Sequence, residues 1–167
     1  MSGLTDRVAR HWPLLALVAS AAMLAAAHAF ETFGHMVPCE LCLKAREVYW
    51  AALAVAGAGV LLRFTTLNGR RLICAILALT FLGGFGLAVY HAGVEWKFWP
   101  GPASCSASGG AVSAADLAKL LSGGPRKPPA CDKPAWVFLG LSMAGWNALV
   151  SLGLAGVSGW SAMRSEP

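Results

Sequence analysis

The sequence predicts an all-α membrane protein, a four-transmembrane-helix bundle with two longer outer loops. Hydrophobic residues fill 57% of its 167 positions and charged residues only 13%, which departs from the composition of an ordinary soluble domain. Long uncharged runs recur along the chain, and roughly 20 apolar residues cross a bilayer as a helix. We therefore expect one integral membrane domain over residues 1–167, with spans at about 12–30, 41–63, 71–94 and 135–161.

The first span is rich in small residues that recur at helical spacing. Because close packing drives helix association in lipid, we expect this face to point toward the other helices. The residues are Ala22, Ala25, Ala26 and Ala29. The same stretch also resembles a secretory signal ending in the cleavage motif Ala27-His28-Ala29. We favour a retained span, since its uncharged run is long for a signal core.

The second span is short of apolar residues on its own. Its uncharged run covers residues 48–62, so its helix has to begin near Leu41 to cross the bilayer. This start places Lys44, Arg46 and Glu47 about one turn inside the membrane boundary. Charge is costly at that depth and is often functional there.

The third and fourth spans carry polar residues within apolar sequence. Asn147, at mid-depth of the fourth span, is expected to hydrogen-bond to a neighbouring helix. At the outer end of the third span, His91 and Glu95 are four residues apart, on one helix face. They suit a metal-binding pair or a proton relay, and we favour a relay through His91.

Charge predicts the orientation of the chain. The net charge of +5 comes from scattered lysines and arginines without a basic run, which argues against nucleic-acid binding. Arginines are dense at both termini and in the short turn after the second span, and the positive-inside rule makes these parts cytoplasmic. They are Arg7, Arg10, Arg63, Arg70, Arg71 and Arg164. The loops at about 31–40 and 95–134 therefore face outward.

The longer outer loop contains a predicted short amphipathic helix. Ser113 and Asp116 form an N-cap pattern, and an apolar stripe continues to Leu121 before Gly123 and Pro125 end the helix. Such a helix is suited to lie on the membrane surface.

Four of the five cysteines, Cys39, Cys42, Cys105 and Cys131, lie in the two outer loops. A zinc site would need four ligands at metal spacing, and the chain has no second Cys-x-x-Cys or nearby His pair, so we expect no metal. Structural disulfides are possible, but a Cys-x-x-Cys bridge closes almost no loop and gains little chain entropy. We favour thiol–disulfide exchange, in which a thiolate attacks a disulfide sulfur.

Pro38 disfavours helix at the residue before it, so the chain approaches Cys39 extended and the second helix begins around the cysteine pair. Unpaired N–H groups in the first helical turn favour a thiolate there. Cys42 and Arg46 share one helix face, so Arg46 either holds an anionic ligand beside the Cys42 sulfur or anchors the helix at the interface.

These residues together resemble the DsbB family of bacterial inner-membrane oxidoreductases, over nearly the whole chain. The resemblance rests on the four spans, on Pro38-Cys39-x-x-Cys42 with Arg46, on the pair Cys105 and Cys131, and on residues 136–141 opening the fourth span. Members of this family reoxidise the periplasmic dithiol protein DsbA and pass the electrons to membrane quinone. The resemblance thus implies that the outer loops are periplasmic.

The resemblance also implies a role for each cysteine. Cys105 would be attacked by the thiolate of a DsbA-like thioredoxin-fold partner, and Cys131 would be the other half of that exchangeable pair. Cys39 would exchange with Cys131, and Cys42 would form an adduct with the quinone ring.

Two further residues would serve the quinone, which is ubiquinone or menaquinone. Arg46 would polarise a quinone oxygen, and His91 would lie near the same depth. The alternative is a membrane structural or assembly protein whose outer loops are stapled by disulfides.

Overall fold

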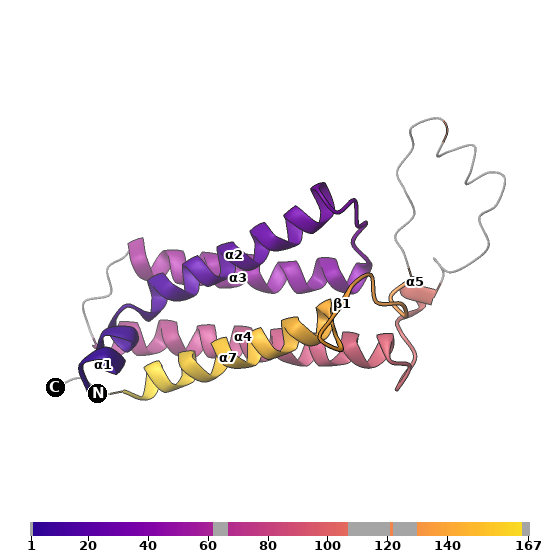
Figure 1. Ribbon diagram of the computed structural model, residues 1–167. Coiled ribbons are helices and arrows are strands. Elements are labelled where there is room, and N and C mark those ends of the chain that lie inside the picture. Colours follow the sequence, from indigo (N-terminus) through magenta and orange to yellow (C-terminus); the bar gives the residue numbers. More distant parts are fainter. Residues whose placement is uncertain (1, 62–66, 107–120, 122–129, 165–167) are drawn as a thin grey trace.

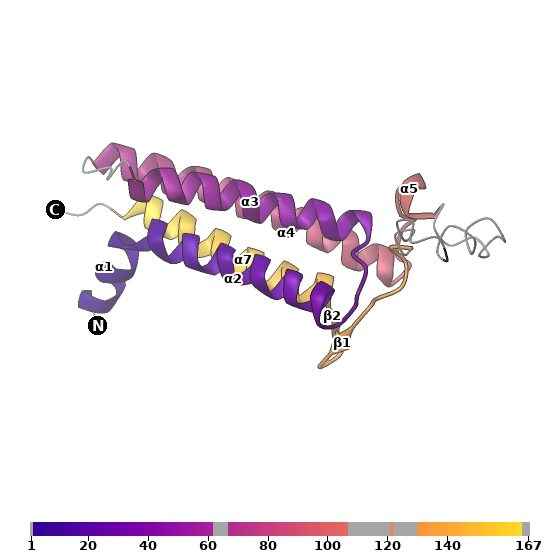
Figure 2. The same ribbon diagram turned by 90° about the horizontal axis from the view of Figure 1, so that it is seen from above.

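The computed structural model describes residues 2–61, 67–106, 121 and 130–164. Its four long helices run side by side as a bundle (Figures 1 and 2): α2 (Trp12–Thr32), α3 (Glu40–Leu61), α4 (Leu67–Glu95) and α7 (Met143–Met163). The shorter elements are α1 (Ser2–Arg10), α5 (Ala103–Ser106) and the strands β1 (Val137–Phe138) and β2 (Leu141–Ser142). Both termini lie at one end of the bundle, and α5 lies at the opposite end (Figure 1).

Among the described residues, two helices are long and apolar enough to cross a membrane, Trp12–Thr32 and Gly69–Glu95. The helix α3 carries charged side chains in its first two turns, and α7 is rich in glycine and serine, which lowers the hydropathy of both. The fold is therefore that of a helical membrane protein, while the number of four spans stays a prediction.

The helices are held together by small residues and by a few polar contacts between them. α4 packs along α7, α2 along α3, and α3 along α4. The Tyr49 hydroxyl of α3 donates to Asn147 Oδ1 of α7 at 2.6 Å, which confirms the predicted bond of Asn147 to a neighbouring helix. The Trp12 indole donates to Ser158 Oγ at 2.8 Å in the same way.

The outward faces of the bundle are apolar. Exposed leucines and a valine cover α2, α4 and α7, as expected of helices whose neighbours are lipid chains. They include Leu14, Leu15, Val18, Leu72, Leu79, Leu82, Leu149 and Leu152. The predicted inward face of α2 is wrong, because Ala22, Ala25 and Ala26 are exposed. Its buried face carries Ala16 and Leu24 instead.

Two helix boundaries differ from the predicted spans. α4 begins at Leu67, four residues before the expected start at 71. α7 begins at Met143 rather than near 135, because β1 and β2 form a hairpin before it. Its turn residues Leu139 and Gly140 have φ of 51° and 79°, the two positive values that a two-residue hairpin turn requires. Ser142 then caps α7 by accepting the Gly145 N–H at 3.2 Å.

One predicted helix lies outside the described residues, and one observed helix was not predicted. The surface helix expected around residues 113–121 lies outside the described residues except for Leu121. The helix α1 was not predicted, and its Asp6 forms an ion pair with Arg164 beyond the end of α7. The Arg164 guanidinium also lies 4.4 Å from the centre of the Trp160 ring. These contacts join the two ends of the chain.

Candidate functional site

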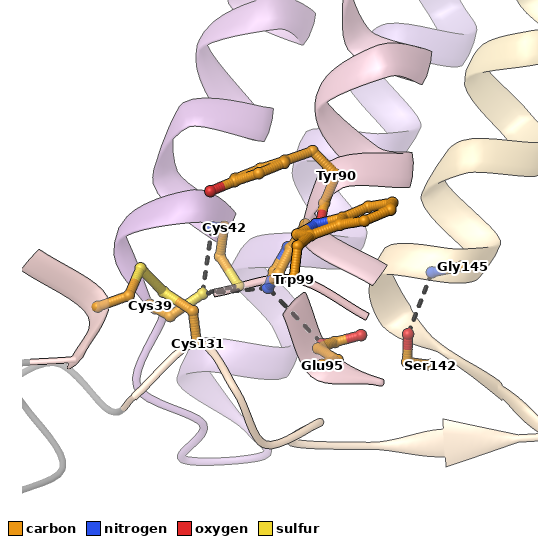
Figure 3. Close-up of polar contacts among 10 residues, drawn as sticks. Cys39, Cys42, Tyr90, Glu95, Trp99, Cys131, Ser142 and Gly145 are labelled. Atoms are coloured by element: carbon orange, nitrogen blue, oxygen red, sulfur yellow. Dashed lines mark hydrogen bonds and ion pairs between the residues drawn. A yellow bond between two sulfur atoms is a disulfide. The ribbon is translucent and has the colours of Figure 1, made fainter. Parts of the chain in front are cut away.

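The four outer cysteines come together at one end of the bundle. Cys39, Cys105 and Cys131 are 5%, 4% and 1% exposed, and they form one buried cluster with Leu41 and Val94, against which Cys42 packs. Cys39, Cys42 and Cys131 are seen close together in Figure 3. The fold thus brings sulfur atoms from both outer loops into one cluster that is largely buried from solvent.

The sulfur atoms form two different pairs. Cys105 and Cys131, 26 residues apart, are joined by a disulfide. Cys39 and Cys42 are free thiols whose sulfur atoms lie 2.7 Å apart and share a hydrogen bond. One pair is therefore oxidised and the other is a dithiol, within one cluster.

Cys39 occupies the N-cap position of α3, directly before Glu40. Its sulfur accepts the Cys42 N–H at 3.3 Å, and its carbonyl accepts the Leu43 N–H at 3.1 Å. The prediction that the second helix begins around the cysteine pair is thus confirmed. The hydrogen bond to the Cys42 sulfur, and then burial, raise the pKa of the Cys39 thiol and outweigh the backbone N–H bonds that lower it. Of the two thiols, Cys39 is therefore the one that loses its proton last.

His91 reaches this pair from α4. Its Nε2 atom lies 3.6 Å from the Cys39 sulfur, 52 residues away in sequence, and 3.6 Å from Glu95 Oε1. Both side chains are buried, and the other Glu95 oxygen, Oε2, has no hydrogen-bond partner. The predicted place of His91 beside the quinone stays a prediction, and the structure adds a contact of its ring with the Cys39 sulfur (Figure 3 shows the adjacent Glu95).

Arg46 is oriented toward α2. One guanidinium nitrogen donates to Glu31 Oε2 at 2.6 Å and the other to the Ala27 carbonyl at 3.2 Å. The Arg46 side chain is 16% exposed and that of Glu31 is 41% exposed, so the ion pair is only partly shielded from solvent. Glu31 was missed by the sequence analysis. Its position could have identified it, because Glu31 and Arg46 are both charged residues at the outer ends of apolar spans.

An aromatic pair closes the end of α4. The Trp99 indole donates to the Tyr90 carbonyl at 2.9 Å, and the two rings stack with centres 6.1 Å apart (Figure 3). The Trp99 ring also lies against Gly93, where a side chain would collide with it. This packing turns the chain back toward the cysteine cluster after α4 ends.

The geometry supports thiol–disulfide chemistry. A dithiol and a disulfide in one cluster can exchange when a thiolate attacks a sulfur of the other pair. A histidine beside one thiol can take up and return its proton. A half-buried Cys42, one turn before a cation on the same helix, supplies a second reactive sulfur.

Comparisons with known proteins agree with this chemistry. The chain matches the family described as "Disulfide bond formation protein DsbB" over residues 9–161. It is 31% identical over 161 residues to "Disulfide bond formation protein B" of Methylococcus capsulatus, covering 90% of this chain and 94% of that protein. The protein of the same name from Stutzerimonas stutzeri is 26% identical over 162 residues, covering 92% and 94%.

A third relative, an uncharacterized protein of Rickettsia prowazekii, is 28% identical over 140 residues, covering 83% of this chain and 79% of that protein. No solved structure matches the chain. The family match covers nearly the whole sequence, and the two apolar helices agree with an inner-membrane oxidoreductase of disulfide bond formation. This chain belongs to the DsbB family.

Proposed function

We propose that this chain generates disulfides by passing electrons from a periplasmic DsbA-like thioredoxin-fold protein to membrane quinone. The observation that carries the proposal is the single buried cluster in which the Cys105–Cys131 disulfide meets the Cys39–Cys42 dithiol. A relay needs two pairs within reach of one another, and the cluster provides them.

Electrons enter at the loop pair. A thiolate of the reduced partner attacks Cys105, forms a mixed disulfide and releases Cys131 as a thiolate. The second thiolate of the partner then attacks the mixed disulfide and leaves with the new disulfide. Cys105 and Cys131 are now a dithiol, and two electrons have moved from the partner to this chain.

Electrons then pass to the helix pair. In its oxidised form the Cys39–Cys42 disulfide is attacked by the Cys131 thiolate at Cys39, which releases Cys42. Attack by Cys105 on the resulting Cys131–Cys39 bond restores the loop disulfide and leaves Cys39 and Cys42 as the dithiol.

Cys42 and Arg46 are the residues that would hold the quinone. The half-buried sulfur and the guanidinium lie one turn apart on α3, and five N–H donors allow Arg46 to keep its two bonds to α2 while donating to a further oxygen. When bound, ubiquinone or menaquinone accepts two electrons and two protons as the dithiol becomes a disulfide. His91 Nε2 is positioned to take the Cys39 proton in that step.

The membrane arrangement follows from charge and fold. α2, α3, α4 and α7 are proposed to span the bacterial inner membrane, with both termini cytoplasmic and the cysteine cluster periplasmic. The helix α1 and the first turns of α4, which carry Arg7, Arg10, Arg70 and Arg71, lie at the end of the bundle opposite the cysteines, which supports this orientation (Figure 1).

The experiment is a quinone-reduction assay on the purified full chain, with all four outer cysteines first oxidised. A reduced DsbA-like dithiol protein is added with a soluble quinone, and the quinone absorbance is followed. We expect quinone reduction that requires the partner and stops in Cys42→Ser. No quinone reduction by the wild-type chain would reject the proposal and leave the stapled structural protein, a role to which the unjoined Cys39–Cys42 pair gives no support.

A further inference from the structure

Three donor atoms converge at the start of α3. The Cys39 and Cys42 sulfurs and His91 Nε2 all lie within 4.8 Å of one another. Two of them come from the first turn of α3 and one from the outer end of α4, so the set exists only in the folded chain. Sequence spacing excluded a metal site because it could not bring His91 to the cysteines.

One of two separations between these donor atoms fits a tetrahedral zinc centre, and the other has to increase. With Zn–S of about 2.3 Å and Zn–N of about 2.0–2.1 Å, tetrahedral angles put sulfur and nitrogen ligands roughly 3.6 Å apart. The Cys39 sulfur and His91 Nε2 are 3.6 Å apart. Two sulfur ligands would be roughly 3.8 Å apart, whereas the observed distance is 2.7 Å. Metal binding therefore requires the two sulfurs to separate by about 1 Å, away from the disulfide distance.

Glu95 supplies a fourth polar group on the histidine side. Its Oε1 lies 3.6 Å from His91 Nε2, and its side chain is 5% exposed. The Ser142 hydroxyl interacts with the carboxyl group, while Oε2 has no hydrogen-bond partner of its own. A buried carboxylate oxygen that lacks a donor is costly. A water held by a metal ion would provide that donor, as in zinc sites with three protein ligands and a bound water.

We propose that the dithiol form of this chain binds a thiophilic divalent cation, of which Zn²⁺ is the type, through Cys39, Cys42 and His91, with Glu95 accepting a hydrogen bond from a metal-bound water. Binding releases the two thiol protons and transfers no electrons. The two thiolates then balance the charge of the dication, so no uncompensated charge is left in the buried cluster. Since the same sulfurs form the disulfide, the metal and the oxidised pair exclude each other, and a bound ion would hold the protein in its reduced form.

The test is a Co²⁺ titration of the full-length Cys105→Ser/Cys131→Ser chain in detergent, without oxygen and without a partner or quinone. In this background Cys39 and Cys42 are the only vicinal thiols. After reduction we expect a sulfur-to-cobalt charge-transfer band with the visible bands of a tetrahedral ion, saturating at a single Co²⁺ per chain. Added Zn²⁺ should displace Co²⁺ and remove both the charge-transfer band and the visible bands. A second preparation is the unsubstituted chain in which only the Cys39–Cys42 pair is reduced. It keeps the Cys105–Cys131 disulfide of the structure.

Variants identify the ligands. Cys42→Ser should abolish the charge-transfer band, and His91→Ala should weaken Zn²⁺ affinity by more than about tenfold. Glu95→Gln should weaken it by about 10-fold, the lower range for a partner of the first ligand shell. Cys74→Ala is the matched control, because this thiol is fully buried in the other hydrophobic cluster of the bundle and should bind Co²⁺ as the parent does.

Absence of the charge-transfer band in both reduced preparations would overturn the proposal. Equal affinity in His91→Ala, or equal binding by the oxidised Cys39–Cys42 form, would overturn it as well. Because the titration needs no turnover, its failure would leave the quinone-reduction assay unaffected, and failure of that assay would not remove the cobalt spectrum.

Discussion

Arg46 is held by its neighbours before any ligand arrives. Its bonds to Glu31 and to the Ala27 carbonyl fix the guanidinium between α2 and α3. A cation placed in this way loses little side-chain entropy when it donates to a quinone oxygen. If Arg46 holds the quinone as proposed, Glu31 would act through Arg46 as a positioning residue.

Substitutions at this ion pair should separate quinone use from partner exchange. Arg46→Ala should raise the KM for quinone by about tenfold or more, because a charge-assisted hydrogen bond of roughly 1.5–3 kcal/mol is lost. Glu31→Gln keeps a neutral acceptor and should raise KM by only a few-fold. Mixed-disulfide formation at Cys105 should be unchanged in both, as followed by gel shift. Equal loss of quinone use and partner exchange in Arg46→Ala would assign Arg46 a structural role.

Substitution of Cys42 should separate quinone reduction from partner exchange. Cys42→Ser should abolish quinone reduction but still allow the partner to form its mixed disulfide at Cys105, which is trapped by a partner that lacks its second cysteine. The measurements are single-turnover quinone absorbance and non-reducing electrophoresis. Cys74→Ala is the control, since Cys74 is fully buried among helix side chains and should leave both readouts unchanged. Persistence of quinone reduction in Cys42→Ser would remove this sulfur from the pathway.

At the scale of elements, local sequence predicted the start of α3 but not which face of α2 is buried. Pro38 and the cysteine pair predicted the start of α3 correctly, because the signal is a steric effect between neighbouring residues. The rotation of α2 was predicted wrongly, since alanines line much of that helix and only its neighbours select the buried face. The same limit hid the contact of His91 with Cys39, which depends on how α3 and α4 pack.

The packing of Trp99 on α4 can be tested with two glycines of the same helix. A Cβ at Gly93 would collide with the Trp99 ring, whereas a Cβ at Gly83 meets nothing within 4 Å. Gly93→Ala should therefore lower the free energy of unfolding by about 1–3 kcal/mol, despite the better helix propensity of alanine. Gly83→Ala should be neutral or slightly stabilising. Both are measured by denaturant unfolding in detergent, and equal effects would show that Trp99 does not pack on Gly93.

At the scale of the whole molecule, the two ends of the helix bundle differ in what they carry. Asp6, Arg164 and the two termini gather at one end, and the sulfur cluster occupies the other (Figures 1 and 2). The sequence predicted that the termini and the cysteines lie at opposite ends of the bundle, because the positions of arginines and cysteines along the chain can be read directly from it. It could not predict the ion pair of α1 with Arg164, which is a contact between residues 158 positions apart.

Reporter fusions test the proposed orientation. Alkaline phosphatase, which folds only in an oxidising compartment, should be inactive when fused after Arg164 and active when inserted after Leu121, whose side chain is 82% exposed. Green fluorescent protein should give the opposite pattern. Active phosphatase at the C-terminal site would invert the topology and place the cysteines in the cytoplasm.

The buried loop disulfide has a consequence for selectivity. Exchange requires the attacking sulfur to approach along the S–S axis, and Cys105 and Cys131 together expose almost no sulfur to solvent. Small thiols such as glutathione therefore meet a closed surface, and we expect them to exchange with this disulfide slowly. In the proposed function, a docked protein partner would use its binding energy to expose the bond. Burial would then keep the disulfide for a docked protein rather than let free thiols reduce it.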